Sequence, residues 1–234
     1  MSIEDVAEVF YDDAGGVRWV IVKKLRAPAA DVAGVALREL SGHRLVTEDD
    51  ALVDVLVADG GTIQRRGHDY EYDLRAVPSG WAETPAPQGF QLSCDLDPEA
   101  LAEAHTLANP PGHPDHEPSL DHVEDLRAMV AGKVIGANVP TATWQISSDE
   151  DGPCGAVLVS DRRHPLCWVL DVFVHPRHQG RGLGGVLLRR SVAGAAEAGY
   201  ETLGLVVSDG NPARRAYDAV GFRHLRSGTN VDLP

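Results

Sequence analysis

The stretch HQGRGLGG, residues 178–185, is the part of the chain whose composition points most directly to chemistry. It contains four glycines and leads into an apolar pattern with helical spacing. Glycines let a backbone approach a phosphate closely, and a helix N-terminus supplies free N–H groups and positive dipole. The stretch therefore predicts a loop that binds a phosphate group.

Two phosphate-binding patterns overlap in this stretch. Gly180, Gly182 and Gly185 spell G-x-G-x-x-G, the dinucleotide fingerprint. Gln179, Gly182 and Gly184 spell Q-x-x-G-x-G, a loop for the pyrophosphate of an acyl-CoA. A lone G-x-G-x-x-G is a weak signal, so the flanking residues must decide between them.

The flanking residues disfavour the dinucleotide and a nicotinamide-dependent oxidoreductase. In a Rossmann unit the first glycine follows the strand almost at once, whereas HPRHQ separates Gly180 from the expected strand end at Val174. The acidic residue expected about 20 residues on, at the end of the next strand, is missing, because Glu201 lies at that strand's start and Asp209 comes late. We therefore favour the acyl-CoA pattern.

Asp171 is a candidate general base, because a carboxylate inside the apolar stretch CWVLDVFV is costly unless it is paired or functional. A hydrogen bond across the sheet is the alternative. The period of a strand places Asp171 on the face opposite Leu170.

The loop GHPDH offers His113, Asp115 and His116. Residues of these types at this spacing could nominally ligate a metal, but the flanking prolines favour an exposed loop and we expect no metal. His113 and His116 are candidate substrate-binding or proton-relay residues, with a solvated loop as the alternative. His175 and His178 are expected to flank the phosphate loop.

Helices and strands alternate around these residues. We expect strands in GFQLSCDL, TATWQISS, GAVLVS, CWVLDVFV and ETLGLVVS. Asp97 and Pro98 predict the start of a helix that runs to Leu107, and Ser119 is expected to cap a second helix through about Val130. Further helices are expected over 185–200, with Val186, Leu187, Ala193 and Ala196 on its apolar side, and over 211–219. Short strands at 222–226 and 229–233 end the chain.

The first part of the chain repeats this design in reduced form. Its expected order is a hairpin (3–12 and 17–25), a helix (29–40), a strand (43–47), a helix (50–59) and two short strands (62–66 and 69–74), which matches the order of residues 154–234. Local echoes such as RWVIV against CWVLDV agree. We infer a degenerate internal repeat, with domains at 1–76 and 90–234 joined by a linker at 77–89, which is rich in proline and glycine. The KKLRAPAADVAG segment that replaces the glycine loop lacks a comparable nest of N–H groups.

Composition limits the function classes. The formal net charge of −14 argues against a nucleic-acid partner and is compatible with an amine substrate. Three cysteines without a C-x-x-C pair fit reduced thiols in a cytoplasmic protein. The acidic N-terminus is unlike a signal peptide, and no apolar run reaches the roughly 18 residues of a membrane span.

The segments WVLDVFVHPRHQGRGLGGVLL and GNPARRAYDAVGF resemble the GNAT superfamily of acyl-CoA-dependent N-acyltransferases. The resemblance covers roughly residues 90–234. It rests on a buried strand ending V-x-P, then Q-x-x-G-x-G and a helix, and later a helix with A-x-x-x-Y that ends at Gly221–Phe222. It implies an α/β (α+β) fold, a mixed twisted sheet flanked by helices, preceded by a smaller N-terminal α/β half-domain.

The resemblance also implies roles for individual residues. Val172, Phe173 and Val174 would pair with the pantetheine arm of acetyl-CoA through their backbone. The pyrophosphate would be held by the loop of Gln179, Gly180, Arg181, Gly182, Leu183, Gly184 and Gly185. Tyr217 would protonate or hydrogen-bond the leaving thiolate, its alternative being a tyrosine that closes the helix onto the sheet. In this family the loop that contains His113 and His116 often builds the acceptor pocket.

Two positions depart from the family pattern. The usual asparagine lies three residues before the helix alanine, where this chain has Gly210, so Asn211 either reaches the cofactor from one position later or caps the helix. Polyamine acetyltransferases carry L-E-D before the strand end, and Leu170 replaces that glutamate here. The chain is thus expected to transfer an acetyl group to an amine by direct attack in a ternary complex. The alternative is a non-catalytic acyl-CoA-binding or regulatory module. A homodimer is also compatible with the resemblance.

Overall fold

The computed structural model describes residues 1–14, 17–116 and 121–234, which fall into two compact units. The first unit comprises Met1–Asp69 and Leu225–Pro234, and the second comprises Tyr70–His224. Strands β4 (Thr62–Asp73) and β10 (Arg223–Asp232) contribute residues to both units. Among the described residues, no helix is long and apolar enough to cross a membrane.

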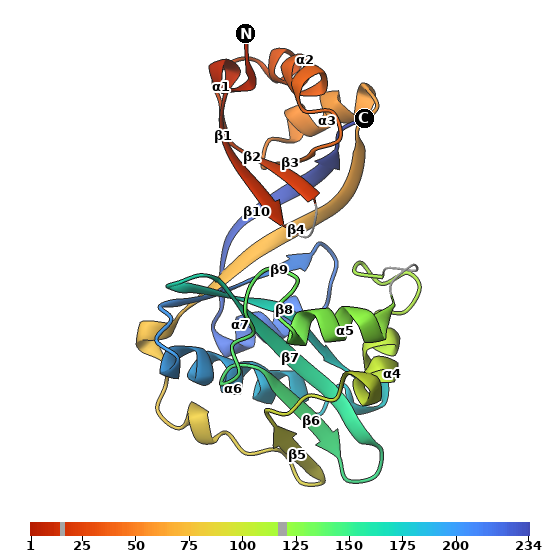
Figure 1. The fold of residues 1–234 in the computed structure, drawn as a ribbon, viewed down its shortest axis with the longest axis vertical. Coiled ribbons are helices and arrows are strands. Elements are labelled where there is room, and N and C mark those ends of the chain that lie inside the picture. The colour runs from red at the N-terminus through yellow and green to blue at the C-terminus, as the bar shows by residue number, and fades with distance from the viewer. Residues whose placement is uncertain (15–16, 117–120) are drawn as a thin grey trace. The chain divides into compact units, whose positions relative to one another are not determined.

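The second unit is built on a mixed sheet with the strand order β4-β9-β8-β7-β6-β5 (Figure 1). Strands β5 to β8 pair antiparallel, whereas β8 and β9 pair parallel. The bounds of the remaining strands are β5 Phe90–Ser93, β6 Trp144–Ser148, β7 Gly152–Arg163, β8 Leu166–Val174 and β9 Thr202–Ser208. Each expected strand is present at its predicted place.

Helices cover both faces of this sheet. Helices α4 (Pro98–Ala108) and α5 (His122–Val130) pack on one side of β7 and β8, and α6 (Leu183–Glu197) and α7 (Arg214–Val220) pack in a separate apolar cluster on the other side (Figure 1). Short 3-10 turns lie at η1 Leu74–Ala76, η2 Trp81–Glu83 and η3 Pro176–His178. The two clusters bury opposite faces of β8, as its almost continuous apolar sequence requires.

Local capping explains where these helices begin and end. The Asp97 carboxylate accepts from the Ala100 N–H at 3.0 Å, with Pro98 in the first turn, as predicted. Helix α5 begins after Asp121, whose carboxylate accepts from Val123 and Glu124; the expected cap, Ser119, lies outside the described residues. Helix α7 ends at Gly221, whose φ of 103° suits glycine.

The first unit is a smaller α/β assembly with the strand order β1-β2-β3-β10-β4. Its elements are α1 Ile3–Val6, β1 Ala7–Ala14, β2 Val17–Leu25, α2 Ala29–Glu39, β3 Arg44–Thr47 and α3 Asp50–Ala58, with the unit's parts of β4 and β10. β3 pairs parallel with β2 and antiparallel with β10. A separate apolar core joins α2 and α3 to these strands.

Three details of the expected elements are wrong. Residues 3–6 form a helix turn rather than a strand, because the Asp5 carboxylate accepts from the Ser2 N–H at 2.7 Å and stabilises that turn. Residues 62–66 and 69–74 belong to one continuous strand, β4, and residues 222–226 and 229–233 to β10. Gly67 and Gly228, which lie in the gaps between the expected strands, are part of β4 and β10.

The compact units also differ from the expected domains 1–76 and 90–234. The expected linker, 77–89, lies inside the second unit, and the last ten residues, Leu225–Pro234, belong to the first. Residues 77–89 hold the 3-10 turn η2 and no strand. The boundary between the compact units falls within β4 and β10, two long strands whose residues are divided between the units.

Candidate active site

Strands β8 and β9 pair over only part of their length. Their parallel pairing joins Leu166 to Thr202, Cys167 to Leu203 and Trp168 to Gly204. Further along, Val172, Phe173 and Val174 pair with Val157, Ala156 and Gly155 of β7. Among the described residues no pairing with β9 is present beyond Trp168, so the backbone edge of residues 172–174 that faces away from β7 has no strand partner, and on it the Val174 carbonyl accepts from the Gln179 side chain.

A β-bulge lies at the point where the two strands diverge. Val159 of β7 pairs with Val169 and Leu158 pairs with Asp171, which leaves Leu170 as the extra residue. Leu170 packs in the cluster under α4 and α5, and Asp171 contacts α4, so both side chains are on the same face. The prediction that they lie on opposite faces is wrong, because the bulge interrupts the period of two.

The glycine loop connects β8 to α6 as the sequence predicts. Gly180 and Gly182 have φ values of 76° and 79°, a conformation that favours glycine. The Gln179 amide donates to the Val174 carbonyl at 3.0 Å and ties the loop to the strand end. The first backbone bond into the helix runs from Val186 N–H to the Gly182 carbonyl at 3.1 Å, so the amides of Leu183, Gly184 and Gly185 precede it.

Neither packing nor backbone conformation explains why residue 184 is a glycine. It lies in the first turn of α6, and a Cβ there would meet nothing within 4 Å beyond its chain neighbours and its own helix. The same open space surrounds Gly180 and Gly182. A phosphate that approaches the backbone from this side would account for glycine at 184, so the loop fits the group that its sequence implies.

His178 directly precedes this loop, and Arg181 lies within it. The buried His178 ring contacts the Asp151 carboxylate through Nε2 at 3.0 Å and the Phe90 ring edge-to-face at 5.5 Å. The Arg181 guanidinium lies 5.9 Å from the Phe90 ring centre. His175 Nδ1 accepts from the Arg177 N–H at 3.1 Å. Both histidines lie directly before the glycine loop, and their ring nitrogens contact neighbouring residues.

Tyr217 is buried in the apolar cluster on the α6 and α7 side of the sheet. The same cluster contains Leu183, and Val172 and Val174 pack against it. Its ring lies 6.2 Å from that of Tyr70 and 5.9 Å from that of Phe222. Tyr217 is therefore in one cluster with the open strand and the first residue of α6, and it also closes α7 onto the sheet.

The Asn211 side chain is engaged at both ends. Its Oδ1 accepts from the Ala213 N–H at 2.7 Å, which supports the start of α7, and its Nδ2 donates to Asp115 Oδ2 at 2.6 Å. The Ser208 hydroxyl donates to the other Asp115 oxygen. Asp115 therefore fastens the 109–116 loop to the end of β9, a positioning role that the sequence did not indicate.

His113 and His116 both turn Nδ1 toward their own loop. His113 Nδ1 accepts from the Asp115 N–H at 3.2 Å, and His116 Nδ1 lies 2.8 Å from the Asn109 carbonyl. Both side chains are partly exposed. Among the described residues, no group of three or more His, Cys, Asp or Glu side chains is arranged to hold a metal ion.

Asp171 belongs to a hydrogen-bonded chain with two histidines, His105 and His122, that the sequence did not single out. His105 Nε2 lies 2.8 Å from Asp171 Oδ2, and His105 Nδ1 lies 3.1 Å from Nδ1 of His122. The His105 side chain is only 3% exposed, and that of Asp171 is 22% exposed. The available signal was the position of His105 four residues after Leu101, on the buried stripe of α4.

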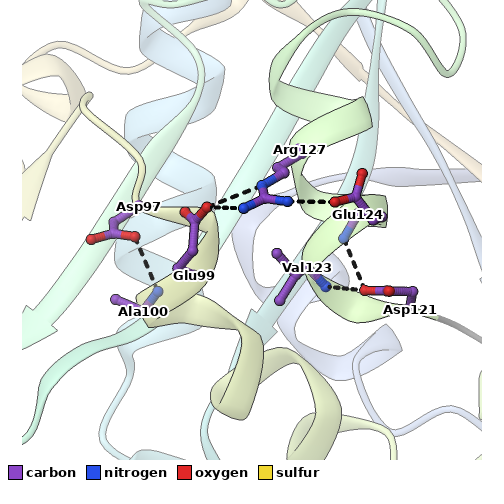
Figure 2. A network of polar contacts seen from close by, with 7 residues as sticks. All are labelled: Asp97, Glu99, Ala100, Asp121, Val123, Glu124 and Arg127. Atoms are coloured by element: carbon purple, nitrogen blue, oxygen red, sulfur yellow. Dashed lines mark hydrogen bonds and ion pairs between the residues drawn. The ribbon is translucent and has the colours of Figure 1, made fainter.

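The helices that carry these histidines are also linked by charged side chains between the first turn of α4 and the last turn of α5. Figure 2 shows Arg127 of α5 between Glu99 of α4 and Glu124, with its Nε donating to Glu99 at 3.0 Å. The same view shows the Asp97 and Asp121 caps. These exposed ion pairs are worth little in stability, and the two helices also pack together through the buried Leu101, Ala104, Leu126 and Met129.

Burial sets the protonation preferences around the histidines. It lowers the pKa of His122 from its usual 6.5, and the neighbouring His105 lowers it further. Burial also raises the pKa of Asp125, whose carboxyl is influenced by His105, Asp171 and His122. His122 therefore favours the neutral form, in which a ring nitrogen can accept a proton.

The cysteines offer no activated nucleophile. Burial raises the pKa of Cys167 to about 12 and also raises the pKa of Cys154. Cys94 is exposed, and its pKa is likewise raised by partial burial. A covalent acyl-enzyme has no support here.

The residues from 99 to 222 match the model of the Acetyltransferase (GNAT) family. This region contains the bulged strand β8, the glycine loop and Tyr217. It also contains the hydrogen-bonded cluster of His105, His122 and Asp171. The match spans more than half of the chain. The chain therefore belongs to the GNAT acetyltransferase family. A comparison with curated proteins found no match.

Solved structures share the fold at low sequence identity. A GCN5-related N-acetyltransferase from Sphaerobacter thermophilus is 15% identical with a TM-score of 0.63, covering 96% of this chain and 75% of its own. One from Kribbella flavida is 16% identical with a TM-score of 0.56, covering 100% and 91%. A tandem GNAT protein from the clavulanic acid biosynthesis pathway is 15% identical with a TM-score of 0.50, covering 97% and 78%. The matched region includes the first unit, consistent with a GNAT-like half-domain before the complete one.

Proposed function

We propose that this protein is an N-acetyltransferase that transfers the acetyl group of acetyl-CoA to an amine by direct attack in a ternary complex. The observation that carries the proposal is the open strand edge at Val172–Val174, followed directly by a glycine loop at the N-terminus of α6. An amide-bearing arm can add to the strand edge while a pyrophosphate meets the loop.

The residues for holding the cofactor follow from this geometry. The backbones of Val172, Phe173 and Val174 would pair with the pantetheine amides. The backbone N–H groups in the loop from Gln179 to Gly185 would bind the pyrophosphate, with Arg181 adding positive charge. Asn211 would support this site indirectly, since its side chain is engaged by Asp115 and the Ala213 N–H.

Acetyl-CoA supplies an activated acetyl thioester and a thiolate leaving group. Tyr217 belongs to the apolar cluster against which Val172 and Val174 pack, and its hydroxyl would donate a proton or a hydrogen bond to the departing sulfur. Asp171, at the bulge, is the nearest carboxylate in sequence to the open edge and would support removal of the amine proton. His113 and His116, on the loop between α4 and α5, would contact the acceptor.

The test is acetyl transfer by the purified full chain across a panel of primary amines, including diamines, amino acids, aminoglycosides and peptides. Release of the CoA thiol and mass spectrometry of the acetylated product are measured together. We expect amine-dependent thiol release with a stoichiometric acetylated product. Binding of acetyl-CoA without transfer to any amine would favour the non-catalytic acyl-CoA-binding module instead.

A further inference from the structure

With Asp171 ionised and His105 neutral, the hydrogen bonds that join Asp171, His105 and His122 all run in one direction. An ionised carboxylate only accepts hydrogen bonds, so His105 Nε2, at 2.8 Å from Asp171, carries the hydrogen. A neutral imidazole has one N–H, which makes His105 Nδ1 the acceptor. His122 Nδ1, at 3.1 Å, must then be the donor, and the lone pair of His122 is left on Nε2.

The two histidines of this hydrogen-bonded chain differ in their exposure to solvent. His105 is almost fully buried between Asp171 and His122, and its ring also lies 4.8 Å from that of Phe173. His122 is the first residue of α5 and is partly exposed. A base within this cluster is therefore reached from outside through His122, whereas His105 is enclosed.

Asp171, the member of the cluster farthest from His122, lies next to the strand edge at Val172–Val174 that is proposed to bind acetyl-CoA. Asp171 immediately precedes Val172, and the bulge at Leu170 turns the Asp171 side chain toward α4. The loop that leads from α4 toward α5 is fastened to the end of β9 by Asp115. The cluster thus joins the element that would hold the acceptor to the strand that would hold the acetyl group.

We propose that His122 is the catalytic base and that His105 and Asp171 are positioning residues, together forming a relay that removes the amine proton; this rests on the proposed acetyltransferase function. His122 Nε2 takes one proton from the acceptor ammonium and leaves a neutral amine. The His122 Nδ1 proton passes to His105 Nδ1. The positive charge then rests on the His105 imidazolium, which the Asp171 carboxylate stabilises, and the reverse transfer returns one proton through His122 to solvent.

The groups around His122 suit a base that is neutral at pH 7. His105 and His116 disfavour its charged form, while Asp121 and Asp125 favour it, and burial is the largest influence. The net result is a pKa below the usual 6.5. Asp171 stands beyond His105 as the compensating negative charge, close enough to stabilise the relayed proton but separated from His122 by the ring between them.

The relay is tested with the acceptor found in the amine panel, on the full chain, with wild type, His122→Gln and Asp171→Asn. We expect kcat/KM of the wild type to fall as pH falls through the His122 pKa, below 6.5. His122→Gln should lose about 10²-fold or more in kcat and lose this acidic limb. Asp171→Asn should keep the limb but lower kcat. The acceptor's own ionisation appears equally in every variant. His43→Gln, in the first unit, is the control and should match wild type.

A second measurement is independent of turnover. The imidazole ¹⁵N shifts of the full chain should show the Nε2–H tautomer at His105 and the Nδ1–H tautomer at His122. The opposite tautomers would overturn the relay, as would a His122→Gln enzyme with wild-type kcat and pH profile. Wild-type protein that transfers acetyl to no amine would instead overturn the proposed function, and the relay with it.

Discussion

At the scale of single residues, a substitution at Gly184 is expected to change protein stability and acetyl-CoA affinity in opposite directions. Nothing near its backbone excludes a methyl group, and its place in a helix favours alanine. Gly184→Ala should therefore raise the free energy of unfolding by up to about 1 kcal/mol while weakening acetyl-CoA binding at least tenfold. Calorimetric titration and denaturant unfolding measure the two effects.

The matched control for this change is Gly34→Ala in helix α2. A Cβ there would meet only the Arg38 guanidinium, at 3.7 Å. It should give a similar gain in helix stability without changing acetyl-CoA affinity. A Gly184→Ala protein that binds acetyl-CoA as tightly as wild type would show that the backbone at 184 does not approach the pyrophosphate.

Tyr217 carries a second prediction at this scale. Tyr217→Phe keeps the ring contacts with Tyr70 and Phe222 but removes the hydroxyl. We expect kcat to fall by about 10²-fold, the lower end for general acid catalysis because a thiolate leaves readily, with little change in KM for acetyl-CoA. Steady-state kinetics decide the matter, and an unchanged kcat would leave Tyr217 with its packing role alone.

At the scale of elements, helix α6 packs closely against the turn before β6 at one glycine and has open space at another. A Cβ at Gly194 would overlap the Thr141 carbonyl oxygen, and the Thr141 hydroxyl also donates to the Gly194 carbonyl at 2.8 Å. Gly194→Ala should therefore destabilise the protein by about 2 kcal/mol or more, the opposite sign to Gly184→Ala in the same helix. Urea unfolding of both variants tests this, and equal stabilities would contradict the packing described.

Periodicity and capping predicted the elements of the second unit well, because Asp97, Pro98 and Gly221 act locally. The bulge at Leu170 could not be predicted in this way, since it depends on which β7 residue Asp171 faces. The contact between His105 and Asp171 joins residues far apart in the sequence, and the pairing of Asp115 with Asn211 and Ser208 is of the same kind. The chemistry-bearing residues were thus visible one by one, while their partners required the fold.

At the scale of the whole molecule, the last residues complete the core of the first unit. Thr229–Asp232 pair with Arg44–Thr47 of β3, and Val231 and Leu233 are buried in that unit's apolar cluster. Removal of Leu225–Pro234 should cost the first unit on the order of 4 kcal/mol or more and expose the amides of β3. Hydrogen exchange with mass spectrometry measures this directly. Leu225→Gln, at a side chain 54% exposed, is the control, and full protection of β3 in the truncated chain would contradict the assignment.

The GNAT structures that match the chain cover the first unit as well as the second, which is consistent with the repeat inferred from the sequence. The first unit nevertheless places KKLRAPAADVAG where the second has its glycine loop, with Pro28 directly before α2. We expect one acetyl-CoA site per chain, in the second unit.

Thermal unfolding of the full chain with acetyl-CoA, CoA and NAD in parallel tests whether the strand edge and the glycine loop bind acetyl-CoA. A ligand at about a hundred times its Kd stabilises the folded state by about 2.7 kcal/mol. We expect a clear rise in Tm with acetyl-CoA and CoA and none with NAD. A rise with NAD alone, or none with acetyl-CoA, would rule out the acetyl-CoA site.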